Sequence, residues 1–149
     1  MRIVVNTSII ISALMKRRSV AYLVLTGLEH EYFIPAHALT EVLEHLDEIM
    51  ERSELTLLEV IGRMLVILER ITIVEEDEVK KHIGEAMKIM GDRDIKDVPF
   101  VAALIAVGAD AVLSYDEDFS EVEKHGYRWL RPADLLQRSP EELDGWLKP

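Results

Sequence analysis

The stretch Arg2-Ile-Val-Val-Asn-Thr-Ser-Ile-Ile-Ile-Ser-Ala-Leu14 decides the fold of this chain. Its apolar run at residues 3–5 predicts a buried strand, and the run that resumes at Ile9 predicts a short buried helix. Between them stand three small polar residues, Asn6-Thr7-Ser8. Open α/β sheets place their sites beyond the carboxyl ends of the strands, where such side chains lie. The opening stretch therefore predicts that part of a functional site lies just beyond the carboxyl end of the first strand.

The rest of the chain alternates between short β-branched or aromatic runs and longer stretches with helical spacing. Further strands are expected at residues 32–34, 71–74, 110–114 and 127–130. Helices are expected at residues 20–28, 37–50, 53–69, 77–90, 100–107 and 132–136, with a last helix that begins at Ser139. This alternation predicts a single domain over residues 1–149, an α/β/α sandwich with a five-stranded, mainly parallel, Rossmann-like sheet.

The helix expected at residues 53–69 carries many aliphatic side chains. We expect Ser53 to cap its N-terminus. Five aliphatic residues at helical spacing are expected to face the core: Leu57, Leu58, Ile61, Leu65 and Leu68. This helix and the region around Trp146 are also the candidate surfaces for a dimer.

The charge balance bears on possible partners. The chain has 149 residues and a net charge of −11, so its overall field does not attract nucleic acid. A nucleic-acid substrate therefore requires local basic patches or bound cations. The cluster Lys16-Arg17-Arg18 is such a patch, although three adjacent cations are more often a solvated turn.

Other features of the composition exclude whole classes of function. The chain has no cysteine, which rules out disulfides and thiolate chemistry. No segment reaches the length of about 18 apolar residues that a membrane span needs, and no signal peptide precedes the first strand, so we expect a cytoplasmic protein. Few amides and many charged residues are typical of a thermophile.

Acidic or amide side chains occur at four places that the predicted fold brings toward one edge of the sheet. They are Asn6 after the first strand, Glu41 in the helix after the second, Asp97 at the start of a buried helix, and Asp116 and Asp118 after the fourth strand. If the first and fourth strands are neighbours, these oxygens converge. Converging carboxylates require a cation, and hard oxygen ligands suit Mg²⁺ or Mn²⁺. Such an ion activates water and stabilises charge on a phosphate.

Each of these acids also has an ordinary structural interpretation. Asp97 is suited to cap the helix that has Pro99 in its first turn. Glu41 lies among several acids on a solvated helix face, and Asp116 and Asp118 lie in a polar loop where aspartate is common. His37 and His45 are expected at the surface or beside the ligands. Only the arrangement of the acids along the fold favours a metal site.

Four segments together resemble the PIN domain family, the metal-dependent ribonucleases that include VapC-type toxins. The segment Val4-Val-Asn-Thr-Ser-Ile-Ile-Ile-Ser-Ala-Leu14 is similar to the first motif of the family, and Thr40-Glu-Val-Leu43 to the second, which supplies a glutamate. Asp97-Val-Pro-Phe-Val-Ala-Ala-Leu104 resembles the third motif, and Gly108-Ala-Asp-Ala-Val-Leu-Ser-Tyr-Asp-Glu-Asp-Phe119 the fourth. The resemblance spans residues 2 to about 132.

The resemblance implies a Rossmann-like fold that cleaves single-stranded RNA with Mg²⁺ or Mn²⁺, often as a homodimer. It also allows the toxin of a toxin–antitoxin pair, with an antitoxin protein as partner. Glu41, Asp97 and Asp116 would be catalytic and would hold the metal together with Asn6 and Asp118. Thr7 and Ser8 would orient the first ligand, and Lys16, Arg17 and Arg18 would contact RNA.

Asn6 departs from the family pattern, which has aspartate at this position. An amide keeps one carbonyl oxygen for a cation but brings no charge. Three explanations fit: natural loss of activity, a site that works without this charge, or an engineered inactive form. The alternative function is therefore an inactive PIN-like scaffold that binds RNA or protein. A third is a receiver-like or small-molecule-binding domain, although no glycine-rich phosphate loop is present.

Overall fold

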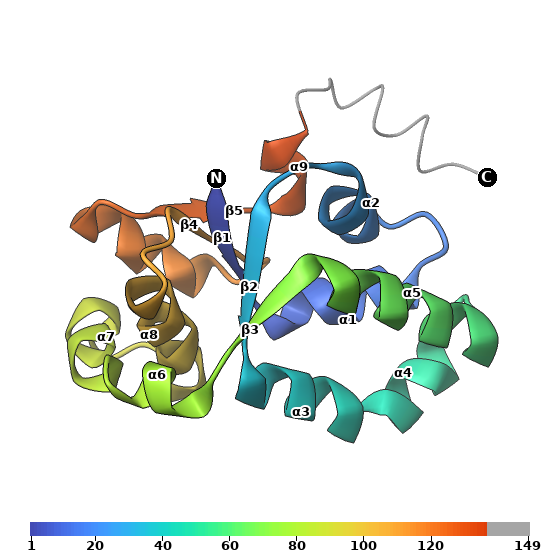
Figure 1. Cartoon of the computed structure of the whole chain (residues 1–149), viewed down its shortest axis with the longest axis horizontal. Coiled ribbons are helices and arrows are strands. Elements are labelled where there is room, and N and C mark those ends of the chain that lie inside the picture. Colours follow the sequence, from blue (N-terminus) through green and yellow to red (C-terminus); the bar gives the residue numbers. More distant parts are fainter. Residues whose placement is uncertain (137–149) are drawn as a thin grey trace.

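A parallel sheet forms the centre of the computed structural model, which describes residues 1–136 (Figure 1). Its five strands lie in the order β3-β2-β1-β4-β5, and every neighbouring pair is parallel. The strands are β1 (Arg2–Val5), β2 (Glu31–Pro35), β3 (Ile71–Val74), β4 (Ala111–Leu113) and β5 (Arg128–Leu130). The predicted α/β fold with its five strands is confirmed, and the sheet is wholly parallel.

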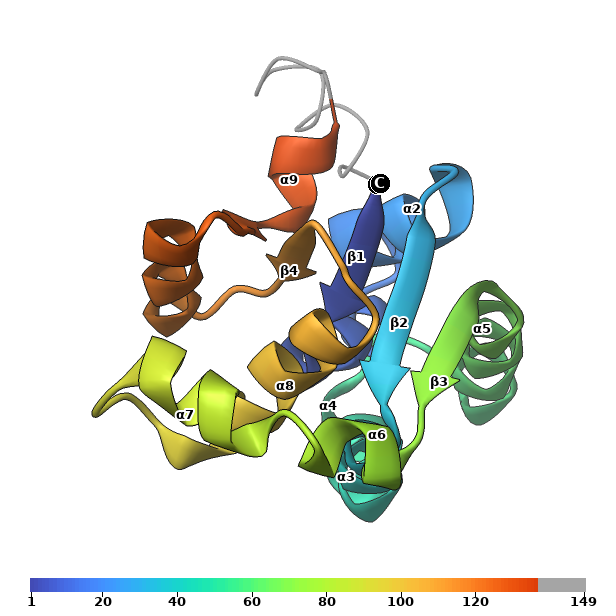
Figure 2. The ribbon, with the colours of Figure 1, turned by 60° about the vertical axis from the view of Figure 1, so that its left-hand side comes forward.

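Helices cover both faces of this sheet, as Figures 1 and 2 show. On one face, α8 (Val98–Ala106) packs on the central strands, with α6 (Glu76–Lys80) and α7 (Ile83–Met90) beside it. On the other lie α1 (Thr7–Met15), α2 (Val20–Gly27) and α5 (Leu57–Arg70). The remaining elements are α3 (Ala36–Glu44), α4 (Leu46–Arg52), α9 (Pro132–Leu135) and two 3₁₀ segments, η1 (Ile95–Asp97) and η2 (Glu117–His125).

The core lies on both faces of the middle strands, under α8 on one face and under α1 and α2 on the other. Residues 100–104 of α8 are each at most 2% exposed, which confirms the prediction of a central buried helix. Ile3, Val4 and Val5 of β1 are also fully buried. Such an apolar run is typical of a strand that is covered on both faces of a parallel sheet. This packing fixes the carboxyl end of β1. It thereby fixes the start of the segment that follows the strand.

Two predicted helices are each broken into two. The helix expected at 37–50 is interrupted at His45, between α3 and α4, and the helix expected at 77–90 is interrupted between α6 and α7. Both α3 and α4 contact α1, and both α6 and α7 contact α8. A straight helix touches another only near their crossing point, so the break lets each pair follow the surface of its partner.

The predicted orientation of α5 is wrong. Its buried side chains are Val60 and Ile67. The leucines and isoleucine expected inside are 38–80% exposed. Arg63 faces inward. Its guanidinium donates to the carbonyl oxygens of Ala13, Lys16 and Arg17. It also stacks on the Tyr22 ring. These contacts stabilise the orientation in which Arg63 faces inward and the row of leucines and isoleucine stays exposed.

The start of α5 also differs from the prediction. Thr56 is the N-cap and forms a capping box with Glu59, whereas Ser53 ends α4 and donates its hydroxyl to the Leu14 carbonyl oxygen at 2.7 Å. The helix expected from Ser139 and the region around Trp146 lie outside the described residues. Within residues 1–136, no helix combines the length and apolarity needed to cross a membrane.

Candidate metal-binding site

The carboxyl ends of β1 and β4 meet, as the metal-site hypothesis requires. Val5 pairs with Leu113 in the sheet, and the Asn6 N–H donates to the Leu113 carbonyl oxygen at 3.0 Å. Asn6 and Ser114, the first residues beyond the two strands, are therefore neighbours. Both are buried, at 7% and 0% exposure. This edge of the sheet is where the acidic residues were expected to converge.

The side chain of Asn6 is occupied by protein hydrogen bonds. Asn6 is the N-cap of α1, and its Oδ1 accepts from the Ser8 N–H at 3.2 Å. The Ser114 hydroxyl donates to the same oxygen at 3.2 Å. A carbonyl oxygen has two lone pairs, and these two bonds use both. Asn6 therefore organises the site, whereas an aspartate here would keep a second oxygen for a ligand.

Ser114 connects Asn6 to the acidic loop after β4. Its Oγ accepts from the Asp116 N–H at 3.0 Å, and Asp116 Oδ1 in turn accepts from the Asp118 N–H at 2.9 Å. This series of hydrogen bonds orients the Asp116 carboxylate and fixes the main chain at Asp118. Ser114 was not among the predicted site residues. The available signal was its position, because a polar residue ends an apolar strand here as Asn6 does in β1.

Asp97 occupies the N-cap position of α8 but makes no capping hydrogen bond. The 3₁₀ turn η1 precedes α8, and Asp94 caps that turn by accepting from the Lys96 N–H at 2.9 Å. Asp97 is only 7% exposed, and its Oδ2 has no hydrogen-bond partner among the described residues. The predicted cap role is therefore wrong, and the Asp97 carboxyl is left facing the other acids.

Three carboxyl groups converge at this point. One oxygen from each of Asp97, Asp116 and Asp118 lies within 4.8 Å of the others. Burial, followed by the charges of Asp116, Asp94 and Asp118, raises the pKa of Asp97 to about 7. A buried carboxyl without a partner, beside two further hard oxygen donors, suits a divalent cation. The residues present therefore fit the metal that the acidic pattern predicts.

Arg93 pairs with the outer side of this cluster. Its guanidinium lies 3.5 Å from Asp118 Oδ1 and 3.0 Å from Glu121 Oε1. Arg93 was not among the predicted site residues, because it lies in a charged loop and its partners in η2 are distant in the sequence. An arginine here offsets part of the negative charge of Asp118 but leaves Asp97 without a partner.

Glu41 lies outside the group of three carboxylates. It projects from α3 with a half-exposed side chain, and its Oε1 lies 3.5 Å from His37 Nε2. The His37 ring packs on Phe100 of α8, with the ring centroids 5.3 Å apart. His37 thus connects Glu41 to the helix that carries Asp97. The role of Glu41 as a ligand remains a prediction.

Thr7 and Ser8 contribute in a different way from the one expected. The hydrogen bond that orients Asn6 comes from the Ser8 main chain. The hydroxyl oxygens of both residues are buried and have no partner within residues 1–136. Together with Asp97 Oδ2, they place unpaired polar atoms near the carboxyl end of β1.

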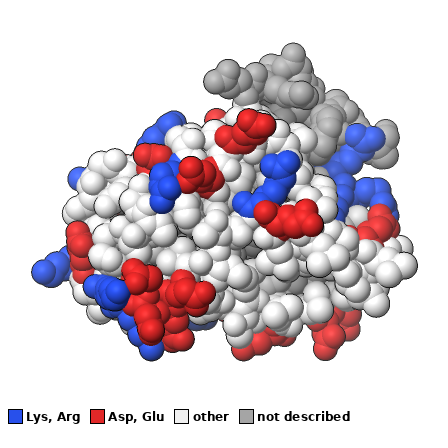
Figure 3. All heavy atoms as spheres, in the orientation of Figure 1, with Lys and Arg blue, Asp and Glu red and all other residues white. Residues whose placement is uncertain are grey.

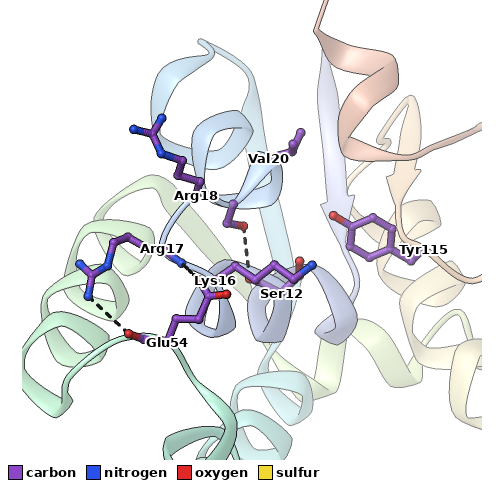
Figure 4. Close-up of a pocket in the computed structure, with 8 residues that line it drawn as sticks. Ser12, Lys16, Arg17, Arg18, Val20, Glu54 and Tyr115 are labelled. Carbon is purple, nitrogen blue, oxygen red and sulfur yellow. Dashed lines mark hydrogen bonds between the residues drawn. The ribbon is translucent and has the colours of Figure 1, made fainter. Parts of the chain in front are cut away.

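The predicted basic patch follows α1, and its three members differ in their contacts. Arg17 forms an ion pair with Glu59 of α5, and its main-chain N–H donates to Glu54 Oε2 at 2.9 Å. Lys16, Arg17 and Arg18 line a cavity of about 500 Å³ that Tyr115 borders from the end of β4 (Figure 4). The patch and the acidic cluster therefore flank the same short segment of chain.

One group of acidic side chains lies far from Lys16. On the face shown in Figure 3, acidic side chains gather over α6, whose first turn holds Glu76, Asp77 and Glu78. The helix α6 belongs to the layer of α8, whereas Lys16 follows α1 on the opposite side of the sheet. The net charge of −11 therefore does not exclude a local site for an anion near Lys16.

Residues 4–128 match the family model described as PIN domain. The matched segment begins within β1, includes β2, β3 and β4, and contains Asp97, Asp116 and Asp118. No curated protein matches the chain.

Proposed function

The chain belongs to the PIN domain family, and from this premise we propose that it is a metal-dependent endoribonuclease that cleaves single-stranded RNA. The proposal includes Mg²⁺ or Mn²⁺ as the ion and the role of a toxin in a toxin–antitoxin pair. PIN domains are generally nucleases, and the acidic cluster supplies donors for a metal. The single observation that carries the proposal is the buried Asp97 Oδ2, which has no hydrogen-bond partner within residues 1–136 and lies beside Asp116 and Asp118.

The residues of the chain have separable roles in this chemistry. Asp97, Asp116 and Asp118 would hold the cation, with Glu41 as a further candidate. When bound, the ion supplies an activated water and offsets charge on the phosphate. Ser114 and Asn6 hold the loop of Asp116 in place through their hydrogen bonds. Lys16 supplies a positive charge for the phosphate backbone.

An inactive scaffold that binds RNA or protein is the second candidate, and Asn6 favours it. The carbonyl oxygen of the Asn6 amide already accepts hydrogen bonds from Ser8 and Ser114. The neutral amide therefore offers a cation neither charge nor a free oxygen. Asn6→Asp would keep these two bonds on one oxygen and present the other to the site. We expect this variant to bind Mn²⁺ more tightly, and equal affinities in calorimetric titration would refute the argument.

Cleavage of labelled single-stranded RNA with Mn²⁺ separates the two candidates. The chain as written, Asn6→Asp and Asp97→Ala are compared, with DNA of the same sequence as a second substrate. Cleavage by the first two and none by Asp97→Ala supports a nuclease that tolerates Asn6. Cleavage by Asn6→Asp alone identifies an inactivated nuclease, and no cleavage by any form supports the scaffold. Equal cleavage of DNA contradicts specificity for RNA.

The proposed partners are an antitoxin protein and a second copy of the chain. The exposed apolar row on α5 supports the second copy, because Leu58 is 80% and Leu65 60% exposed. Contiguous exposed apolar side chains of this kind mark association surfaces. The toxin role predicts growth arrest when the active form is expressed, and normal growth with an active nuclease would contradict it.

A further inference from the structure

The cavity beside Tyr115 is not accounted for by the metal chemistry. It measures about 500 Å³ and lies between the end of β4 and the loop that joins α1 to α2. Cavities that hold small ligands measure about 300–1,000 Å³. We call it the Tyr115 cavity. Its lining includes Ser12, Lys16, Ser19, Glu54 and Tyr115.

Tyr115 presents an aromatic ring that has no aromatic or cationic partner among the described residues. It is 43% exposed, a large fraction for a tyrosine next to a buried strand. The ring and cation–π contacts within residues 1–136 do not include it. Figure 4 shows Tyr115 on the wall opposite Arg17 and Glu54. Packing of the fold does not explain this ring.

Tyr115 also has a defined relation to the acidic cluster. It directly precedes Asp116, whose backbone is extended. Tyr115 lines the cavity, and Asp116 belongs to the carboxylate group, so the two sites lie on either side of one peptide unit.

Lys16 is one of the three basic residues that line the cavity, together with Arg17 and Arg18. Its ammonium is exposed and forms no ion pair among the described residues, whereas Arg17 is paired with Glu59. In Figure 4 the Arg17 guanidinium points away from Tyr115, toward Glu54. Glu54, the acid in the wall, already accepts the Arg17 N–H. The cavity thus combines an aromatic face with a cation whose charge is not neutralised.

We propose that the Tyr115 cavity holds one nucleotide of a single-stranded RNA whose neighbouring phosphodiester lies at the acidic cluster. Tyr115 stacks on the base, and Lys16 pairs with a phosphate. Stacking on an aromatic side chain accepts any base, so this subsite binds the strand without reading its sequence. The proposal rests on the proposed function for its substrate, and it adds a subsite that precedes the chemical step.

Binding in EDTA tests this subsite independently of cleavage. The probe is fluorescein-labelled oligoadenylate RNA, followed by fluorescence anisotropy over a range of salt concentrations. The forms compared are the chain as written, Tyr115→Ala, Tyr115→Phe and Lys16→Ala. Lys88→Ala is the matched control, because Lys88 is an exposed lysine of α7 outside the cavity.

We expect Tyr115→Ala to weaken binding about tenfold, because a stacked base contributes about 1–3 kcal/mol. Tyr115→Phe keeps the ring and should bind within about twofold of the chain as written. Lys16→Ala should lower the slope of log affinity against log salt by about 0.7, the value for one phosphate contact on a single strand. Lys88→Ala should leave both quantities unchanged.

The outcomes separate this proposal from the proposed function. Binding that depends on Tyr115 and Lys16 supports the subsite even when no form cleaves RNA with Mn²⁺. Unaltered binding by Tyr115→Ala and Lys16→Ala overturns the subsite even when the chain cleaves RNA. Absence of binding by the chain as written at low salt also overturns it. A loss in Lys88→Ala equal to that in Lys16→Ala assigns the effect to overall charge and overturns the role of Lys16.

Discussion

Asp97 should destabilise the metal-free protein at neutral pH, and Asp97→Asn should remove this penalty. The pKa of Asp97 is raised from 3.8 to about 7, first by burial and then by the charge of Asp116. The unfolded chain ionises this carboxyl near pH 4, whereas the folded chain keeps the proton until about pH 7. Stability is therefore fully present below pH 4, falls as the pH rises between these values, and is lowest above pH 7.

The size of the penalty follows from the pKa difference. A shift from 3.8 to about 7 corresponds to about 4 kcal/mol at 1.36 kcal/mol per unit. Asp97 is buried, but Asp116 beside it is exposed, so solvent screens part of the interaction. We therefore expect Asp97→Asn to stabilise the protein by about 2 kcal/mol at pH 8 and hardly at all at pH 4. For a chain of this size, the gain at pH 8 raises the Tm by about 4–8 °C.

Thermal and urea unfolding at pH 4, 6 and 8 in EDTA measure this effect. The matched control is Asp92→Asn, which neutralises an exposed aspartate of the preceding loop and should show no such pH dependence. Saturating Mn²⁺ should stabilise the chain as written, by about 2.7 kcal/mol at 100 times the Kd, and stabilise Asp97→Asn much less. A gain that is equal at pH 4 and pH 8, or no gain at either, would refute the reasoning.

Three further changes test the site, a helix cap and the dimer. Ser114→Ala leaves the Asp116 N–H without its acceptor and should lower the free energy of unfolding by about 1–3 kcal/mol in urea; an unchanged midpoint contradicts this role. Thr56→Ala removes the cap of α5 and should cost about 1 kcal/mol, seen as a Tm about 2–4 °C lower, whereas an equal Tm would show that the cap is dispensable. Leu58→Glu should convert a dimer to a 17.0 kDa monomer in light scattering, and an unchanged dimer excludes the α5 face.

The positions of the strands and of most site residues were predictable because the signals are local. An apolar run that stops at a polar residue marks the end of a buried strand, and parallel strands align these ends. Asn6 and Asp116 were found in this way. Ser114 was missed although it obeys the same rule, because its role depends on a hydrogen bond to a residue 108 positions away.

The errors share a different cause. The apolar residues of α5 form a wide arc, so its periodicity offers two inner faces, the one with Val60 and Ile67 and the row that was expected inside. Arg63 decides between them through carbonyl groups of α1 and the following loop, which no spacing rule within the helix can indicate. Asp97 was assigned as a cap because the sequence does not show that Asp94 and the turn η1 come before it.

Local sequence patterns were enough to predict the alternation of strands and helices, the parallel sheet and the presence of acids at its carboxyl edge. These follow from periodicity and strand ends, which depend on neighbouring residues. The folded structure was needed to show that Asp97 has no hydrogen-bond partner for Oδ2 within residues 1–136, that Glu41 lies outside the group of Asp97, Asp116 and Asp118, and that the Asn6 oxygen accepts from Ser8 and Ser114. Each of these findings depends on which residues, distant in the sequence, lie within hydrogen-bond distance of a polar atom. Folding alone brings those residues together.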